Sequence, residues 1–393
     1  MDGGVLLPSV AEMVARLRPD EPLHCVRPAA LAEAALTFIR AFPGDVLYAV
    51  KCNPDPMVLR ALWDGGIRHF DVASPAEFRL VARLFPGAGL HYMHPVKARS
   101  AIAAACHQTG VRDFALDTPD ELDKLRHETG DARDLGLIVR LALPPDGDSL
   151  CGMSGKFGAS PEAAVALLRA ARRYARRLGI SFHVGSQCLV PEAYERALAL
   201  AGRVVAGAGV NLEILDVGGG FPVAYPGLKP PPAAAFLAAI ERGVARLGLG
   251  RHCRLWCEPG RALTAAGVSV VTRVLQRRGH ALYLTDGLYG SLADAGLSRL
   301  CYPARLIRPG GGEPAAPAPF TLFGPTCDSL DRIAGPFLIP DDVAEGDWIE
   351  FGLVGAYGGC LRTAFNGFER ILIAEVADQP LLATPGHPAR FAA

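Results

Sequence analysis

Residues 46–54 read VLYAVKCNP, an apolar run rich in β-branched and aromatic residues that stops at a lysine. Runs of this kind are typical of buried strands. Seven more follow before residue 260, separated by stretches with apolar residues three and four positions apart. The predicted strands are Val46–Val50, His69–Val72, Leu90–Met93, Asp113–Leu116, Leu137–Leu141, Ser181–Val184, Ile214–Val217 and Arg254–Cys257.

The stretches between these strands have helical periodicity, most clearly from Pro161 to Leu178. Several of them open with a proline after a polar residue, which is a frequent helix start. These starts are Ser74-Pro75, Thr118-Pro119 and Ser160-Pro161. Eight strands that alternate with helices predict an α/β fold with a (β/α)8 barrel, and an open doubly wound sheet is the alternative.

The pattern changes after about residue 265, where strand-like runs follow one another with few helical stretches between them. The predicted strands of this part are Val268–Leu275, Ala281–Thr285, Trp348–Leu353 and Arg370–Val376. A turn-rich loop is predicted from Pro309 to Pro319. We therefore predict a barrel domain over residues 26–265 and a β-rich domain over residues 266–393, with residues 1–25 packed on the latter.

Composition excludes several classes of protein. The 393 residues carry no formal net charge, which leaves no basic footprint for nucleic acid. The sequence contains no apolar stretch long enough for a membrane span and no secretory signal pattern, so we expect a cytoplasmic protein. The ten cysteines are scattered and lack zinc-finger spacing, so we expect no metal.

Polar motifs stand where several predicted strands end, and in a parallel barrel these ends meet at one mouth that carries the chemistry. Lys51 ends the first strand. A desolvated lysine there has a lowered pKa and can attack an aldehyde, although a surface lysine is the alternative. His183, near the end of the sixth strand, can stack on a flat ring, or it is a satisfied core histidine. Ser186 can hydrogen-bond a phosphate.

Two glycine-containing turns follow the seventh and eighth strands. Gly218–Gly220 lets backbone N–H groups approach an anion closely, or it is simply a tight turn. Glu258–Arg261 offers a carboxylate for a pyridinium nitrogen and a guanidinium for phosphate, or the two charges form a structural salt bridge.

The second predicted domain adds two motifs. In FGPTCDSLD, residues 323–331, Cys327 beside Asp328 can act as an acid or nucleophile, or it is a buried thiol beside a capping aspartate. Tyr357, between glycines, can present its hydroxyl to an anion, or it is an ordinary turn aromatic.

In this order, the motifs make the chain similar over essentially its whole length to the fold-type III pyridoxal-phosphate (PLP) decarboxylases. These enzymes act on ornithine, lysine, arginine or diaminopimelate. FGPTCDSLD resembles the ornithine/lysine branch, because diaminopimelate enzymes tend to have a Cys-Glu pair where this chain has Cys327-Asp328. The resemblance implies an alanine-racemase-like second domain, PLP as cofactor and a head-to-tail homodimer with shared active sites.

The resemblance also implies roles for individual residues. Lys51 would hold PLP as a Schiff base, and His183 would stack on its ring. Glu258 would face the ring nitrogen, which favours decarboxylation over racemisation. Cys327 would reprotonate the α-carbon and Asp328 would bind the distal ammonium of the substrate, both in the site of the partner subunit. The other implied cofactor contacts are Asp71, Glu77, Arg140, Ser186, Gly219, Gly220, Gly260, Arg261 and Tyr357.

One departure concerns the substrate. Eukaryotic ornithine decarboxylases have a second aspartate after a tyrosine that follows a DG-YGS motif, but here Tyr302 is followed by Pro303. An insertion, Leu292–Gly296, precedes them, and its Asp294 could supply the missing carboxylate. We therefore expect decarboxylation of L-ornithine to putrescine, and also of L-lysine to cadaverine. The alternatives are another substrate (diaminopimelate, arginine or a carboxylated polyamine) or a non-catalytic homologue that regulates a true decarboxylase.

Overall fold

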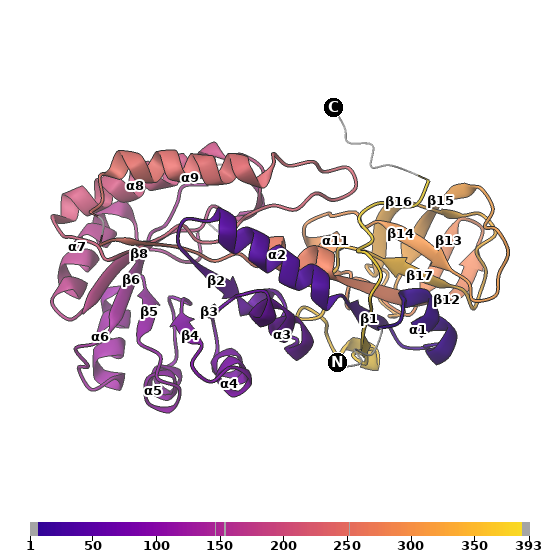
Figure 1. The fold of residues 1–393 in the computed structure, drawn as a ribbon, viewed down its shortest axis with the longest axis horizontal. Helices are drawn as coiled ribbons and strands as arrows, with labels where there is room; N and C mark the ends of the chain where they lie inside the picture. The colour runs from indigo at the N-terminus through magenta and orange to yellow at the C-terminus, as the bar shows by residue number, and fades with distance from the viewer. Residues whose placement is uncertain (1–6, 146, 153–154, 251, 387–393) are drawn as a thin grey trace, which may run out of the picture.

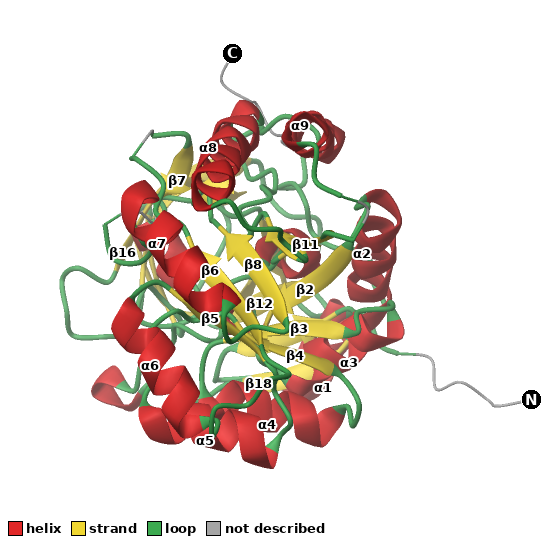
Figure 2. Ribbon diagram, turned by 90° about the vertical axis from the view of Figure 1, so that its left-hand side faces the viewer, coloured by secondary structure: helices red, strands yellow, loops and turns green. Residues whose placement is uncertain are grey.

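The computed structural model describes residues 7–145, 147–152, 155–250 and 252–386, which form two lobes side by side (Figure 1). In one lobe, eight parallel strands close into a barrel (Figure 2). The barrel strands are β2 (Asp45–Ala49), β3 (His69–Val72), β4 (Gly89–Tyr92), β5 (Asp113–Leu116), β6 (Gly136–Arg140), β8 (Arg177–Ser181), β10 (Ile214–Asp216) and β11 (Arg254–Cys257). The predicted (β/α)8 barrel is confirmed, and the open doubly wound sheet is wrong.

Among the described residues, eight helices alternate with these strands and surround the barrel (Figure 2). They are α2 (Pro28–Ala41), α3 (Pro56–Asp64), α4 (Pro75–Leu84), α5 (Arg99–Gln108), α6 (Pro119–Glu128), α7 (Pro161–Arg172), α8 (Glu192–Ala208) and α9 (Ala233–Leu247). The predicted starts are confirmed: Ser74, Thr118 and Ser160 each accept a backbone N–H from the first turn, and proline follows each cap.

The sixth barrel strand lies earlier than predicted. Helix α7 ends at Arg172 rather than Leu178, and β8 covers Arg177–Ser181 rather than Ser181–Val184. Leu178 stands at helical spacing from the apolar face of α7, yet its side chain is buried as part of the strand. Because β8 ends at Ser181, His183 lies two residues beyond the strand, in the loop above the barrel.

The inside of the barrel is apolar only at mid-height. Successive side chains of a strand point to opposite faces, so alternate residues face inward. The apolar residues of this interior cluster are Leu47, Met93, Ala115, Ile138, Ile214 and Trp256. At the amino ends of the strands a polar group follows, in which His91 contacts both His69 and Asp113. The carboxyl ends carry the charged side chains of the candidate site.

The second lobe is built on an eight-stranded sheet in which β14-β17-β12-β13-β15-β16 pair in this order. Its strands in this region are β12 (Val268–Arg278), β13 (Ala281–Leu284), β14 (Ala304–Ile307), β15 (Pro317–Phe323), β16 (Arg332–Pro340), β17 (Trp348–Phe351) and β18 (Leu372–Glu375). The sequence did not predict β14, β15 or β16, and the predicted loop 309–319 overlaps the start of β15. The β-rich second domain itself is confirmed.

The amino-terminal segment lies on the β-rich lobe (Figure 1). Helix α1 (Val10–Leu17) packs Val10 and Val14 with Trp348, and β1 (Leu23–Val26) pairs with both β12 and β18. These contacts are between residues far apart in sequence. We therefore propose to place residues 7–25 with the second domain and to keep the boundary near residue 265, while residues 1–6 of the predicted segment lie outside the described residues.

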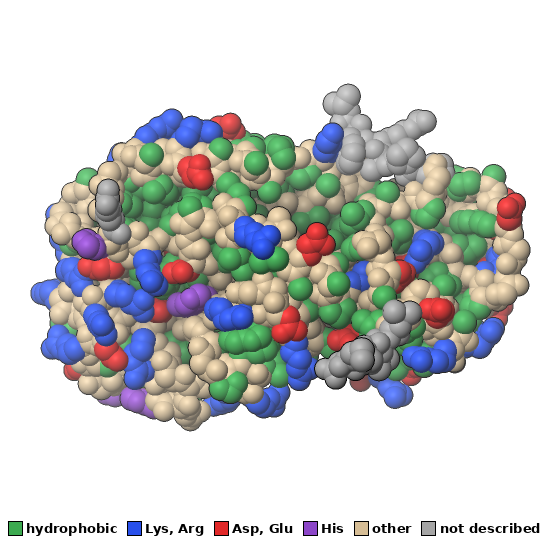
Figure 3. Space-filling model, in the orientation of Figure 1, with side chains coloured by type: hydrophobic (Ala, Val, Ile, Leu, Met, Phe, Trp, Pro, Cys, Tyr) green, Lys and Arg blue, Asp and Glu red, His purple; other side chains and the backbone are tan. Residues whose placement is uncertain are grey.

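Charged side chains of both signs are interspersed over the face seen in Figure 3, as expected of a chain without net charge. Within the described part of the chain, no helix is both long and apolar enough to span a membrane. The same residues contain no group of three or more His, Cys, Asp or Glu side chains that could hold a metal ion.

A buried polar cluster ties β1 to the turn after β13 and to the carboxyl-terminal segment. His24 Nε2 lies 2.7 Å from Ser291 Oγ, and Arg362 Nη2 lies 3.0 Å from the same oxygen. Arg362 also pairs with Asp286 at 2.6 Å. Burial, together with the positive charge of Arg362, lowers the pKa of His24 to about 4.

This cluster predicts a loss of stability in mild acid. The pKa of His24 is lower in the folded protein than in the unfolded chain. Below pH 6.5, His24 therefore binds a proton in the unfolded chain but stays neutral in the folded protein. The free energy of unfolding should therefore fall by about 3 kcal/mol between pH 6.5 and 4 through this group. His24→Gln should remove that part of the slope in denaturant unfolding. The matched control is His127→Gln on the exposed surface of α6. Equal slopes for wild type and His24→Gln would contradict the prediction.

Candidate active site

Lys51 lies in the 3-10 turn η1 (Val50–Cys52) directly after β2, and its Nζ is 2.7 Å from Oδ2 of Asp71 on β3. Burial alone would lower the pKa of Lys51, but the carboxylates of Asp71 and Glu258 outweigh burial and raise it. The expectation of a lowered pKa for Lys51 is therefore wrong. The ion pair with Asp71 thus favours the charged form of the amine.

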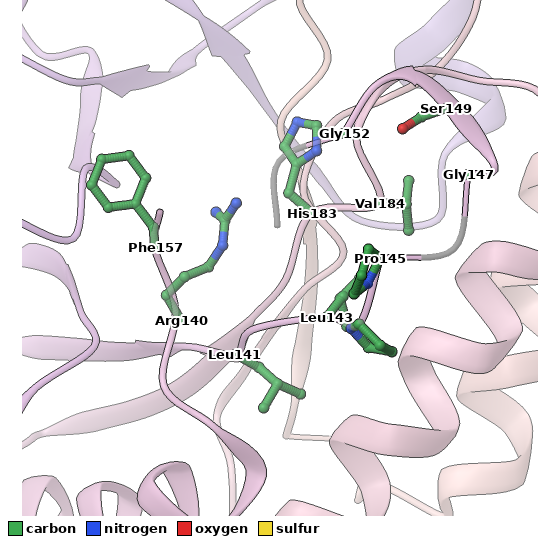
Figure 4. A pocket seen from close by; sticks show the side chains of 11 residues that line it. Arg140, Leu141, Leu143, Pro145, Gly147, Ser149, Gly152, Phe157, His183 and Val184 are labelled. Atoms are coloured by element: carbon green, nitrogen blue, oxygen red, sulfur yellow. The ribbon is translucent and has the colours of Figure 1, made fainter. Parts of the chain in front are cut away.

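Lys51 borders a cavity of about 380 Å³ at the barrel mouth, which is within the usual range for small-molecule sites. The lining residues are Lys51, Asp71, Ala73, Met93, His94, Pro95, Arg140, Gly152, Lys156, Phe157, His183 and Glu258. The structure thus brings five of the sequence-predicted site residues to one cavity. A neighbouring cavity of about 150 Å³ shares Arg140 and His183 with it, and Figure 4 shows both side chains in its wall.

Glu258 follows β11 and is buried, and its Oε1 has no hydrogen-bond partner. Burial raises the pKa of Glu258 well above its usual value, and the carboxylates of Asp216 and Asp71 raise it further. Asp216, at the end of β10, is also buried and accepts the Gly218 N–H at 2.8 Å. Burial and the two neighbouring carboxyl groups therefore favour the neutral form of Glu258, while the charges of Lys51 and Arg140 oppose them.

His183 lies in the loop after β8, where its Nδ1 accepts the Gly185 N–H at 2.9 Å. Burial lowers the pKa of His183 well below its usual value, and the charges of Arg140 and Lys51 lower it further. The imidazole is therefore neutral, with its proton on Nε2. A neutral flat ring in the cavity wall is suited to stacking on a planar ligand.

The Gly218–Gly220 loop lies against the backbone of neighbouring loops. A Cβ on Gly219 would stand 2.5 Å from the Glu258 carbonyl, and one on Gly220 would stand 2.4 Å from the Gly185 carbonyl. Gly220 also has a φ of 106°, which other residues rarely adopt. Ser186 starts the adjacent β9 (Ser186–Cys188). No side chain fits in this loop, so its backbone can closely approach a ligand.

Arg261 opens the short helix α10 (Arg261–Thr264) after Gly260 and is almost fully buried. Its Nη1 donates to the Tyr225 hydroxyl at 3.0 Å, and its Nη2 forms an ion pair with Asp294 Oδ2 at 2.7 Å that is not an aligned hydrogen bond. Its Nε is buried without an acceptor. The guanidinium also lies 5.1 Å from the ring centre of Tyr357.

Tyr357 is linked to the lysine by the backbone. Its N–H donates to the Cys52 carbonyl at 2.9 Å, and it has a φ of 59°. A Cβ on Gly260 would stand 2.8 Å from the Cys52 Cβ, so the α10 turn also packs directly on the lysine-bearing turn. Arg261, Tyr357 and Lys51 therefore belong to one packed unit.

Cys327 and Asp328 follow β15 in the other lobe and do not line the cavity of their own chain. Cys327 is exposed, and its N–H donates to Asn366 Oδ1 at 3.1 Å. The Leu330 N–H, together with the Tyr289 hydroxyl, lowers the pKa of Asp328. The two side chains thus present a thiol and a carboxylate at the surface.

Two other predicted residues lie outside the cavity wall. Glu77 is in the first turn of α4, where its Oε2 accepts the Ala73 N–H at 2.6 Å and burial raises its pKa. Tyr302 is buried in the core of the β-rich lobe, with its ring centre 6.0 Å from that of Tyr225.

Sequence reasoning gave no role to three residues that hold the predicted ones in place. Asp216 is beside Glu258, Tyr225 bonds Arg261, and the Tyr289 hydroxyl donates to Asp328. Tyr289 stands beside a glycine, in the DGLYGS motif, as Tyr357 does in its own turn, so the same signal could have found it. Tyr225 carries no such signal, because its partner follows 36 residues later.

The known proteins with similar sequences are decarboxylases. The sequence profile described as "Pyridoxal-dependent decarboxylase, pyridoxal binding domain" matches residues 29–265. A lysine/ornithine decarboxylase from Selenomonas ruminantium is 35% identical over 344 residues, covering 85% of this chain and 84% of that protein. An ornithine decarboxylase from Panagrellus redivivus is 32% identical over 378 residues, covering 89% and 84% respectively.

Solved structures of decarboxylases superpose on nearly the full length of this chain. The lysine/ornithine decarboxylase of Vibrio vulnificus, complexed with cadaverine, superposes with a TM-score of 0.79 at 32% identity and covers 94% of this chain and 97% of its own. The arginine decarboxylase of Paramecium bursaria Chlorella virus, bound to agmatine, superposes with a TM-score of 0.81 at 26% identity and covers 93% and 99%.

Proposed function

This chain belongs to the fold-type III PLP decarboxylases, in their ornithine/lysine branch, and on that premise we propose that it converts L-ornithine to putrescine. It is a PLP-dependent decarboxylase of basic amino acids. The finer assignment to ornithine, with lysine as a second substrate, is our proposal. The observation that carries it is the Cys327-Asp328 pair, in which the half-buried carboxylate of Asp328 stands beside the exposed thiol of Cys327.

The residues present fit the cofactor. Glu258 Oε1 and Arg261 Nε are buried polar atoms without partners, and they match a ring nitrogen and a phosphate oxygen respectively. Gly219 and Gly220 leave a backbone cradle that no Cβ could occupy. Lys51 reaches the same mouth. We therefore assign Arg261, Tyr357, Ser186 and the glycine loop to the phosphate, Glu258 to the ring nitrogen and His183 to the ring face.

When bound, PLP supplies an electron sink for the pair of electrons left on the α-carbon as CO2 departs. The protein's own part is positioning and proton control. Lys51 would hold the cofactor aldehyde through its Nζ, and Asp71 Oδ2 lies 2.7 Å from that nitrogen and would orient it. Glu258 would face the ring nitrogen, where its carboxylate would stabilise the positive charge of the protonated ring.

The position of Cys327 supports a shared active site. Neither Cys327 nor Asp328 borders the cavity that contains Lys51 of the same chain, and Cys327 is exposed. We propose that a second copy of the chain contributes these two side chains, in a two-fold dimer that completes both sites. Cys327 Sγ then delivers a proton to the α-carbon, and Asp328 pairs with the distal ammonium.

Asp328→Asn should raise KM for ornithine about 10- to 100-fold and change kcat less. Asp328 is already oriented by Tyr289 and Leu330, so an amide keeps its shape but loses the charge-assisted bond to the ammonium. The measurement is CO2 release as a function of ornithine concentration. Asp123→Asn, at an exposed position on α6, is the matched control and should leave KM unchanged.

The substrate proposal is tested by comparing kcat/KM for ornithine, lysine, arginine and diaminopimelate. Ornithine should have the highest kcat/KM and lysine the next highest. Lysine is one methylene longer than ornithine, and one methylene changes kcat/KM by only about 10- to 200-fold. A preference for arginine or diaminopimelate would overturn the substrate assignment. An unchanged KM for ornithine in Asp328→Asn would overturn the role of Asp328.

A further inference from the structure

Arg261 has one nitrogen that the described protein leaves unused. Tyr225 accepts from Nη1, Asp294 pairs with Nη2, and Nε is buried without an acceptor. The side chain is only 5% exposed, so water does not readily replace the missing partner. An orphaned buried N–H is costly, which indicates that Nε is the atom that a ligand oxygen is meant to reach.

Asp294 is itself held in place before any ligand binds. Its Oδ1 accepts the Ser298 hydroxyl at 2.7 Å across helix α11 (Ala293–Leu297), and its carbonyl accepts the Ser298 N–H at 2.9 Å. The Ser298 hydroxyl in turn lies 3.0 Å from the Cys151 thiol on β7 (Ser149–Cys151) of the barrel lobe. The carboxylate beside Arg261 is therefore preorganised by contacts from both lobes.

We propose that Asp294 is a positioning residue for the cofactor: it fixes Nη2 of Arg261 so that the Nε–H faces the phosphate of PLP. This inference rests on the proposed role of Arg261 as a phosphate ligand. It assigns Asp294 to the cofactor end of the site rather than to the distal ammonium of the substrate. The carboxylate acts through the orientation of Arg261 and makes no contact with the phosphate itself.

The orientation has a physical reason. A guanidinium presents its N–H groups in a fixed planar fork, so fixing Nη1 and Nη2 also fixes the direction of Nε–H. Tyr225 alone holds one corner and leaves the plane free to rotate about that bond. Asp294 supplies the second point, and the ring of Tyr357 at 5.1 Å limits movement on one side.

The test measures the dissociation constant of PLP by absorbance titration of the full-length protein after removal of its cofactor. Asp294→Ala should weaken PLP binding about tenfold, because Arg261 loses its second point of attachment. Asp294→Asn should weaken it less, because the amide keeps an oxygen beside Nη2 and a partner for Ser298. Ser298→Ala should give a smaller change in the same direction. Asp341→Asn, which breaks an exposed pair with Arg277 in the β-rich lobe, is the matched control.

The ³¹P resonance of bound PLP gives a second readout, since a change in the partner of the phosphate should shift it in Asp294→Ala but not in Asp341→Asn. PLP binding in Asp294→Ala that equals wild type would overturn the inference. Tighter binding would also overturn it, because the carboxylate would then compete with phosphate for Arg261. A rise in KM for ornithine with unchanged PLP affinity would instead identify Asp294 as a substrate acid.

Arg261→Met separates this inference from the proposed site. If Arg261→Met leaves PLP affinity unchanged, the phosphate assignment itself is wrong. If Arg261→Met weakens binding and Asp294→Ala does not, only the role of Asp294 is wrong. Should Asp294→Ala fail to fold, as judged by circular dichroism, the isosteric Asp294→Asn and the Ser298→Ala variants still decide the question by the direction of the change.

Discussion

Lys51→Ala is expected to lower kcat/KM by at least about 10³-fold and to abolish the visible absorbance of covalently bound PLP. In our proposal the lysine bonds the cofactor and also helps to position it in the cavity. Loss of the amine removes both contributions. Absorbance spectra of the purified variant with added PLP, together with CO2 release, provide the measurement.

The position of Lys51 in the cavity wall, rather than a lowered pKa, favours Lys51 over the other lysines as the cofactor lysine. Burial lowers the pKa of Lys97 to about 8, which by itself would favour Lys97 as the nucleophile. The Lys97 amine, however, is fully enclosed by Glu121 and by the carbonyls of Ala115 and His94, and it does not border the cavity. Lys51 borders the cavity, and the carboxylate of Asp71 in the same wall orients its amine.

Lys156 is the matched control, because it is the other lysine in the cavity wall. It is exposed and lies 4.9 Å from the ring centre of Phe157, without a carboxylate partner in the cavity wall comparable to Asp71. Lys156→Ala should keep the visible absorbance that Lys51→Ala loses. The reverse result would show that the assignment of the cofactor lysine is wrong.

The barrel could be predicted because each of its strands is a short apolar run bounded by turn residues, which is a local property of the sequence. The boundary error at β8 has the same origin: Leu178 fits the spacing of α7, and only the pairing of Leu178 with β6 makes it a strand residue. Strand β15 contains two prolines, at 317 and 319, which hide it from pattern recognition.

The candidate site was predictable where a residue type and its place in a motif carry the information, as for Lys51, His183 and Glu258. The candidate site was not predictable where the properties of a side chain depend on residues that are distant in sequence but adjacent in the fold. The pKa of Lys51 rises because β3 places Asp71 beside it, and this reverses the expectation from burial alone. The sequence predicts Asp294 as a substrate residue, but the fold places its carboxylate against Arg261, 33 residues earlier in the chain.

Cys327→Ala is expected to lower kcat about 10²- to 10⁴-fold, the usual range for a lost general acid, with little change in KM for ornithine. In our proposal the thiol supplies a proton after the carboxylate has left, so substrate binding should not depend on it. Asp328, which binds the distal ammonium in our proposal, stays in place through Tyr289 and Leu330. Steady-state CO2 release gives both constants.

Mixing Cys327→Ala with Lys51→Ala shows in which chain the thiol acts. If Cys327 serves the partner's cavity, a hybrid dimer contains one site with both residues intact and one with neither. Random exchange makes about half of the dimers hybrid, so about a quarter of wild-type activity should return. If the thiol serves its own chain, every site in the mixture lacks one residue and no activity returns. Because Cys327 is exposed and lies outside the cavity of its own chain, we expect the first outcome.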